Sequence, residues 1–277
     1  IFAALGVRVT LLDKADRPIA FLDREITDVF VAEFESKGGR FLGNRVVERV
    51  QSDGMGEVVT TLAGGEGVSS EKMMCALGRV AQVDGLDLEA AGLKPDPRGI
   101  IAVDANYRTA VPGIYAVGDL IGPPSLAAAS MEQGRRAARH AIGLPVDDRS
   151  QTIPTGVYTL PEMASVGLTE AEAVEHYGGV SVGRARFAEL ARGQICGDRR
   201  GLLKLIAHPN GGRVRGVQIA GEGATELIHV GQMAIIGRLG LEVFIENVLN
   251  FPTLAEAYRV AALDAIGRSR ASLQRAA

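Results

Sequence analysis

The stretch from Thr109 to Asp119, TAVPGIYAVGD, constrains the fold of this chain more than any other segment. Ile114 to Val117 is a short apolar run that predicts a buried strand, and Gly118 and Asp119 follow it directly. Ligands of parallel α/β sheets bind at the carboxyl ends of the strands, so this strand is expected to end at a binding edge. Gly118 lets a ligand approach the backbone closely, and Asp119 can accept hydrogen bonds from a sugar-like hydroxyl group.

A helix is expected after this stretch, from Leu126 to Ile142. The first N–H groups of a helix lack partners within the helix, and they favour an electron-rich ligand. The residues at this helix start, Leu126 and Ala127, are therefore candidate ligand contacts. A further strand is expected over Gly99 to Val103.

The first part of the chain alternates between strand and helix. Val7 to Leu12 predicts a buried strand that ends at Asp13, Asp23 is expected to cap a helix running to about Lys37, and Phe41 to Leu42 predicts a second short strand. Three further β segments are expected to form a small antiparallel insertion, over Val46–Gln51, Glu57–Leu62 and Lys72–Ala76. This order is typical of the back half of a dinucleotide-binding fold.

The beginning of the chain reads as the end of a helix, with Gly6 as its stop signal and no start signal before it. We therefore expect the sequence to be the C-terminal part of a longer protein.

The last part of the chain, after the polar segment 147–151, predicts an α+β domain. Strands are expected near Val157–Thr159, Ser181–Phe187, Leu202–Ala207 and Val214–Ala220, with a tight turn over Pro209 to Gly212 and helices over Gly223–Leu239 and Thr253–Gly267. The fold class is thus α/β, with a partial dinucleotide-binding, Rossmann-like region followed by an α+β domain. The expected domains are 1–78, 79–150 and 151–277.

Composition excludes several classes of protein. Hydrophobic residues make up 47% of the chain, and the formal net charge of -3 gives no reason to expect a nucleic-acid or anionic-membrane partner. No apolar run approaches the ~20 residues of a membrane span. The two cysteines, Cys75 and Cys196, form no C-x-x-C pair and fit a reducing cytoplasm, and no histidines pair at metal-ligand spacing.

Asp13 and Lys14 form a second candidate site. An acidic residue at the tip of the second strand of a dinucleotide fold receives the ribose 2′-hydroxyl of NAD, whereas a cation beside it can meet the 2′-phosphate of NADP. A strand-ending Asp-Lys pair on a solvated turn explains these two residues equally well.

The stretch from Thr109 to Asp119 resembles the second FAD-binding motif of the pyridine nucleotide-disulfide oxidoreductase superfamily. The resemblance implies that Asp119 binds a ribityl hydroxyl of FAD and that the backbone at Leu126 and Ala127 lies beside the flavin ring. Gly78-Arg79 is similar to the Gly-Arg segment that lies near the nicotinamide site in that superfamily; the alternative for it is a turn with a surface arginine.

The segment Asn250 to Glu256, NFPTLAE, departs from the disulfide-reducing members, which carry a His–Glu pair for acid–base chemistry. Glu256 is retained, but Phe251 occupies the histidine position, and a phenyl ring cannot carry a proton. Three other segments resemble the soluble pyridine nucleotide transhydrogenases, in which an aromatic residue also precedes the Pro-Thr: Ala20–Asp23, Ile153–Tyr158 and Ala255–Leu263.

The resemblance implies a cytoplasmic homodimeric flavoprotein, assembled through its C-terminal domain, that passes a hydride between NADPH and NAD+ through FAD. The alternatives are a dihydrolipoamide dehydrogenase-like disulfide reductase and an inactive dimerisation fragment. The 277 residues by themselves are expected to be inactive, because the Gly-rich turns that bind the pyrophosphates of FAD and NAD(P) are not among them.

Overall fold

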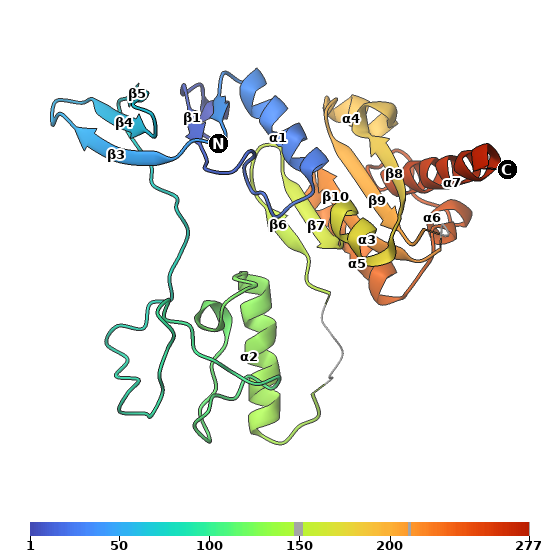
Figure 1. Cartoon of the computed structure of the whole chain (residues 1–277). Helices are drawn as coiled ribbons and strands as arrows, with labels where there is room; N and C mark the ends of the chain where they lie inside the picture. Colours follow the sequence, from blue (N-terminus) through green and yellow to red (C-terminus); the bar gives the residue numbers. More distant parts are fainter. Residues whose placement is uncertain (147–151, 210–211, 277) are drawn as a thin grey trace. The chain divides into compact units, whose positions relative to one another are not determined.

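The computed structural model describes residues 1–146, 152–209 and 212–276. The chain forms two compact units. The first comprises Ile1–Met73 together with Thr152–Ala277, and the second comprises Met74–Gln151. Figure 1 shows the order of the elements along the chain.

The first compact unit begins with a strand–helix–strand motif. A short 3₁₀ helix, η1 (Ala3–Leu5), ends at Gly6 with a left-handed backbone, as the sequence predicts. β1 (Thr10–Leu12) pairs in parallel with β2 (Arg40–Leu42), and α1 (Arg24–Ser36) connects them. The Asp23 side chain accepts a hydrogen bond from the Glu25 N–H at the start of α1, which confirms the predicted cap.

An antiparallel three-stranded sheet follows, consisting of β3 (Val47–Ser52), β4 (Val58–Leu62) and β5 (Gly67–Ser70). The prediction of the third strand over Lys72–Ala76 was wrong. The chain turns at Gly64-Gly65 and forms β5 directly afterwards, so β5 is the strand that pairs with β4. Residues 71–80 come after β5 and are exposed. A strand needs a neighbour for its backbone hydrogen bonds, and β5 has taken the place beside β4.

A five-stranded antiparallel sheet forms the body of the first compact unit. Its strand order is β6–β7–β10–β9–β8. The strands are β6 (Thr155–Val157), β7 (Met163–Gly167), β8 (Ser181–Arg186), β9 (Leu202–Ala207) and β10 (Val214–Ala220). The predictions for β8, β9 and β10 are confirmed, the strand expected near Val157–Thr159 shares only Val157 with β6, and β7 was not expected. The antiparallel β9–β10 pair is as predicted, although Asn210 and Gly211 of the expected turn lie outside the described residues.

Helices cover both faces of this sheet. α5 (Ala224–Ile236), α6 (Glu242–Glu246) and α7 (Glu256–Ala276) contribute to the same hydrophobic core as Leu203 and Leu205 of β9. α1 and α3 (Glu170–Tyr177) pack on the opposite face, against Leu202 and Ile206 respectively. Neighbouring residues of a strand point to opposite faces, so β9 is buried along its whole length. The short helices η3 (Phe187–Glu189) and α4 (Ala191–Cys196) lie between β8 and β9 in the chain.

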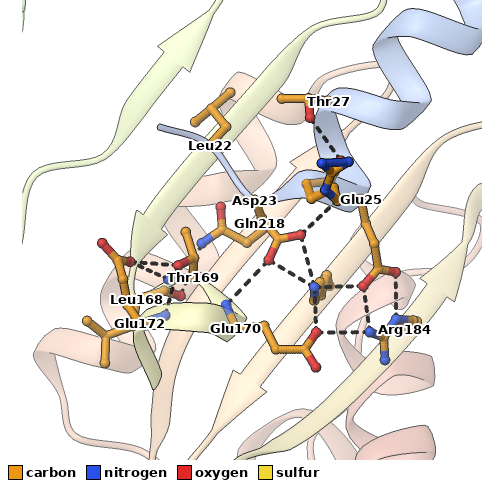
Figure 2. Close-up of polar contacts among 12 residues, drawn as sticks. Leu22, Asp23, Glu25, Thr27, Leu168, Thr169, Glu170, Glu172, Arg184 and Gln218 are labelled. Atoms are coloured by element: carbon orange, nitrogen blue, oxygen red, sulfur yellow. Dashed lines mark hydrogen bonds and ion pairs between the residues drawn. The ribbon is translucent and has the colours of Figure 1, made fainter. Parts of the chain in front are cut away.

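A buried lysine lies between the two apolar clusters on the α1 face of the sheet. Lys204 Nζ contacts both carboxylate oxygens of Asp23 at 2.9 Å, Glu25 at 2.7 Å and Glu170 at 2.6 Å, and the Lys204 side chain is 3% exposed. Arg184 on β8 bridges Glu25 and Glu170 from the other side, with Nε 2.7 Å from Glu25. Figure 2 shows these contacts, which join α1, α3, β8 and β9. We call these five residues the ion cluster.

The ion cluster changes the acidity of its members. The hydrogen bond from Arg184 is the largest cause that lowers the pKa of Glu25, from 4.5 to about 2, and Lys204 adds to the shift. Burial by itself lowers the pKa of Lys204, but hydrogen bonds with Glu170, Glu25 and Asp23 outweigh it and raise that pKa above its usual value. Glu25, Arg184 and Lys204 are therefore charged at neutral pH.

The second compact unit contains little regular structure in its described part, residues 74–146. η2 (Gly118–Ile121) and α2 (Ala127–Ala141) are its helices. α2 begins after Leu126 and ends before Ile142, as the sequence predicts. The predicted strands Gly99–Val103 and Ile114–Val117 are not formed.

Residues 107–109 and 114–116 instead form a narrow hairpin around Pro112-Gly113. The hairpin is held by Thr109 N–H to Ile114 O at 2.9 Å and Ala116 N–H to Tyr107 O at 3.1 Å, with a single bridge between Arg108 and Tyr115. No strand within the described part of this unit runs beside 114–117, so the ladder of a parallel strand has no partner there.

We predict that Lys204→Met strongly destabilises the protein. The change leaves the buried carboxylate of Asp23 without its cation, and breaking a buried ion pair typically costs about 3–5 kcal/mol. The measurement is the free energy of unfolding in urea at pH 7. Lys37→Met is the matched control, because it removes an exposed pair with Glu33, which is typically worth about 0–1 kcal/mol. Equal losses for the two variants would contradict the prediction.

We also predict an acid-dependent contribution from Glu25. Its pKa is lower in the folded than in the unfolded protein, so its stabilisation is present above pH 4.5 and is lost as the pH falls towards 2. Glu25→Gln should cost roughly 1–2 kcal/mol at pH 7, after allowance for the partial exposure of the carboxylate. The difference from wild type should shrink between pH 4.5 and 2. Urea unfolding across this range checks it, with the exposed Glu48→Gln as control; a difference that does not change with pH would refute it.

Candidate functional site

Asp13 lies at the carboxyl end of β1, where the sequence places it. Its backbone N–H donates to Leu42 O at 3.2 Å, and its carbonyl accepts from the Arg45 N–H at 2.9 Å. One carboxylate oxygen, Oδ1, accepts a hydrogen bond from the Ala15 N–H at 2.9 Å. Within the described part of the chain, Oδ2 has no partner, so it is available to a ligand hydroxyl.

The loop after Asp13 is fixed against the end of β2. The Asn44 N–H donates to Ala15 O at 2.8 Å, and a Cβ on Gly43 would lie 2.7 Å from Asp16 O. Only glycine at position 43 therefore permits this close approach. Lys14 is exposed on the loop and makes no ion pair with any residue that the structure describes.

Gly118 is held in the first turn of η2 in the second compact unit. Its φ is +74°, a left-handed conformation that favours glycine, and its N–H donates to Gln133 Oε1 at 2.7 Å. Gln133 is 5% exposed and belongs to α2, so this buried hydrogen bond ties the residue before Asp119 to the helix. A Cβ at Gly118 would lie 3.1 Å from Ser130 Oγ, which leaves little room for a larger residue.

The Asp119 carboxylate is paired with Arg79. Arg79 Nη2 lies 3.2 Å from Asp119 Oδ2, and the two side chains are 81% and 37% exposed. Because an exposed pair of this kind contributes only about 0–1 kcal/mol, a ligand can replace either partner. Gly78, with φ +103°, precedes Arg79 and has open space where a side chain would lie.

The start of α2 is free of side-chain caps. Leu126 is the N-cap residue and makes no side-chain hydrogen bond to the first turn, which begins with Ala127. The N–H groups of that turn and the positive end of the helix dipole therefore favour an electron-rich ligand atom. The contact of Leu126 and Ala127 with a ligand stays a prediction.

The structure groups the predicted residues into two sets. Gly78, Arg79, Gly118, Asp119, Leu126 and Ala127 belong to the second compact unit, and Asp13 and Lys14 belong to the first. The Arg79–Asp119 pair was not expected. The two residues are far apart in the sequence, and only the folded unit shows that they meet.

Phe251 is exposed in the segment before α7. The side chain has 74% of its surface accessible, while Thr253 Oγ1 donates to Asn250 O at 2.7 Å. The Glu256 carboxylate lies 3.4 Å from the Thr253 N–H at the helix start. Glu256 thus contacts the backbone of its own segment.

Metal and thiol chemistry have no assembled site in the described residues. No group of three or more potential metal-ligating side chains is present among them. Cys75 and Cys196 are both exposed and unpaired. No described helix is long and apolar enough to cross a membrane.

Two family models together match most of the chain. One, described as "Pyridine nucleotide-disulphide oxidoreductase", matches residues 1–134, and the other, described as the dimerisation domain of the same family, matches residues 153–262. The chain belongs to the pyridine nucleotide-disulphide oxidoreductase family. This confirms the predicted fold class and the resemblance seen in the sequence.

Relatives in this family include proteins named soluble pyridine nucleotide transhydrogenase. The one from Mycobacterium bovis is 44% identical over 272 residues, and the one from Hahella chejuensis is 41% identical over 272 residues. The matches cover 98% and 97% of this chain but 58% of each relative, so the chain spans a little over half the length of these proteins.

Solved structures support the same fold. The crystal structure of LpdA from Mycobacterium tuberculosis matches with a TM-score of 0.83 and a sequence identity of 28%. The match covers 95% of this chain and 58% of LpdA. The HOCl-induced flavoprotein disulfide reductase RclA from Escherichia coli matches with a TM-score of 0.87 and a sequence identity of 24%. The match covers 95% of this chain and 60% of RclA, and it concerns the fold alone.

Proposed function

We propose that this protein, at the length of its transhydrogenase relatives, is an FAD-dependent enzyme that transfers a hydride between NADPH and NAD+. The observation that carries the proposal is the 44% identity across 98% of the chain to a protein named soluble pyridine nucleotide transhydrogenase. Phe251 supports it, because this position cannot donate the proton that a disulfide reductase needs for its leaving thiol.

The residues of the second compact unit fit one edge of FAD. Asp119 accepts a hydrogen bond from a ribityl hydroxyl, and Gly118 keeps the backbone beside it free of a side chain. The N–H groups of the first turn of α2, beginning with Ala127, have no side-chain cap and are offered to the electron-rich edge of the flavin ring. The Leu126 N–H donates to Pro124 O at 3.0 Å, so Leu126 contributes its backbone beside the ring rather than a free donor. When bound, FAD supplies a group that accepts a hydride from one nucleotide and donates it to the other.

The remaining site residues bind the nicotinamide nucleotides. Asp13 Oδ2 accepts from the ribose 2′-hydroxyl of NAD, and Lys14 meets the 2′-phosphate of NADP. Gly78 and Arg79 lie beside the nicotinamide, and Arg79 exchanges its contact with Asp119 when the ligands enter. Asp13 and Lys14 therefore offer one group for each of the two nucleotides.

The protein acts as a cytoplasmic homodimer assembled through its C-terminal domain. The family model that matches residues 153–262 is described as a dimerisation domain. α5 presents three exposed apolar residues at helical spacing, Val230, Met233 and Ile236, with 38–56% of their surfaces accessible. An apolar stripe of this kind suits contact with a second copy. The proposal includes three domains, 1–78, 79–150 and 151–277.

The alternatives are a dihydrolipoamide dehydrogenase-like disulfide reductase and an inactive dimerisation fragment. A fragment retains the dimer contacts without binding flavin. The amount of flavin per purified chain separates it from both enzymes.

We predict that the full-length protein reduces thio-NAD+ with NADPH and reduces lipoamide or glutathione disulfide barely above background. An acid–base pair typically contributes about 10²–10⁴-fold in rate, and Phe251 cannot supply it. The assay uses one NADPH concentration and three acceptors. Turnover of either disulfide as fast as thio-NAD+ would show that the transhydrogenase proposal is wrong.

We further predict that Asp119→Ala weakens FAD binding. The loss of a hydrogen bond to a charged group typically costs about 1.5–3 kcal/mol, which corresponds to roughly 10- to 100-fold in affinity. The FAD affinity is measured by fluorescence titration of the apoprotein, and the amount of flavin bound per chain is measured after dialysis. Asp104→Ala is the control, since its carboxylate contacts Arg108 and its own turn. Unchanged affinity in Asp119→Ala would exclude Asp119 from the flavin site.

A further inference from the structure

The segment from Asp13 to the first residue of α1 carries three cations, Lys14, Arg17 and Arg24. The structure gives each a different environment. Lys14 is exposed and makes no ion pair with a described residue. The other two are engaged, but with partners of different kinds.

Arg17 is committed to the fold of its own segment. Its Nη1 donates to Leu22 O at 2.9 Å and to Thr27 Oγ1 at 3.3 Å, and its Nη2 donates to Ala20 O at 2.7 Å. These contacts close the loop onto the first turn of α1. A ligand that drew Arg17 outwards would break several backbone contacts, so this cation is not free to bind one.

Arg24 is held by a partner that a ligand can replace. Its guanidinium pairs with the Asp16 carboxylate, and the two side chains are 60% and 47% exposed. A pair this exposed contributes only about 0–1 kcal/mol and is screened by salt. The carboxylates next to Arg24 in the sequence do not compete for it, because Asp23 and Glu25 contact Lys204 in the ion cluster.

The Asp16–Arg24 pair lies within reach of Lys14. Lys14 and Asp16 are separated by one residue, Ala15, so their Cα atoms are at most about 7.6 Å apart. The loop cannot move away freely, because its carbonyls at Asp13 and Ala15 accept hydrogen bonds from Arg45 and Asn44. Lys14 and Arg24 both have long, exposed side chains, so a phosphate bound to the Lys14 ammonium can also be reached by the Arg24 guanidinium once Asp16 releases it.

We propose that Arg24 is a second cation for the 2′-phosphate of NADP, and that Asp16 holds it when NAD is bound. This inference rests on the proposed function and extends its nucleotide site by two residues. The 2′-phosphate carries up to two negative charges and accepts a bidentate contact from a guanidinium, so it displaces the single carboxylate of Asp16. NAD lacks this group, and Arg24 then stays on Asp16.

Isothermal titration of the full-length flavoprotein with 2′,5′-ADP and with 5′-AMP tests the proposal without relying on turnover. We expect Arg24→Gln to weaken 2′,5′-ADP about tenfold and to leave 5′-AMP within about twofold, because only the first ligand carries the 2′-phosphate. Asp16→Asn removes the competing carboxylate and should tighten 2′,5′-ADP about two- to fivefold. Arg24→Lys keeps the charge and should retain part of the affinity.

Arg200→Gln is the matched control, because Arg200 pairs with Glu33 at the other end of α1 and is similarly exposed. We expect both ligands to bind this variant as they bind wild type. Equal weakening of both ligands by Arg24→Gln, no weakening at all, or the same loss in Arg200→Gln would overturn the role of Arg24.

The two proposals fail in different ways. Transhydrogenation by wild type with an unaffected Arg24→Gln variant refutes only the role of Arg24. A selective loss of 2′,5′-ADP in a protein that does not transfer hydride to thio-NAD+ supports that role and refutes the proposed function.

Discussion

The contact between Lys204 and Asp23 determines how the first compact unit is built. Asp23 caps α1 through one carboxylate oxygen and binds Lys204 through both, so the start of the helix is fixed to the middle of the five-stranded sheet. Lys204 is a single charge on a strand that is otherwise apolar, and it is tolerated because three carboxylates surround it. Residues from opposite ends of the sequence therefore form one folded body.

This attachment bears on the proposed nucleotide site, because the loop that carries Asp13 and Lys14 leads into α1. Arg17 ties that loop to the first turn of the helix, and Lys204 ties the first turn to the sheet. The apolar contacts of Leu22 and Ile26 with Met163 and Leu202 lie beside the ion cluster and stabilise the same junction. The dimerisation domain thus supports the loop that carries Asp13 and Lys14.

Elements that depend on local interactions were predicted correctly, and an element that depends on a distant partner was not. Gly6, the Asp23 cap, both ends of α2 and the strands β9 and β10 were predicted to within a residue or two, because caps and apolar runs act on their own segment. The strand predicted at Ile114–Val117 was wrong for a non-local reason. A strand exists only where a neighbour completes its hydrogen bonds, and in the described part of the second compact unit 114–117 has only the short segment 107–109 beside it, through a single bridge.

The sequence by itself determined the family, the order of the α/β and α+β regions and the candidate cofactor residues, because these depend on residue types at fixed spacing. The tertiary structure decided which charges meet. Lys204 and Asp23 are 181 residues apart, and nothing in their local sequence marks them as partners. The same is true of Arg79 and Asp119, and of the contrast between Arg17, which closes the loop, and Arg24, which stays exchangeable. Ion pairing depends on distance and exposure in space, and only the folded chain sets both.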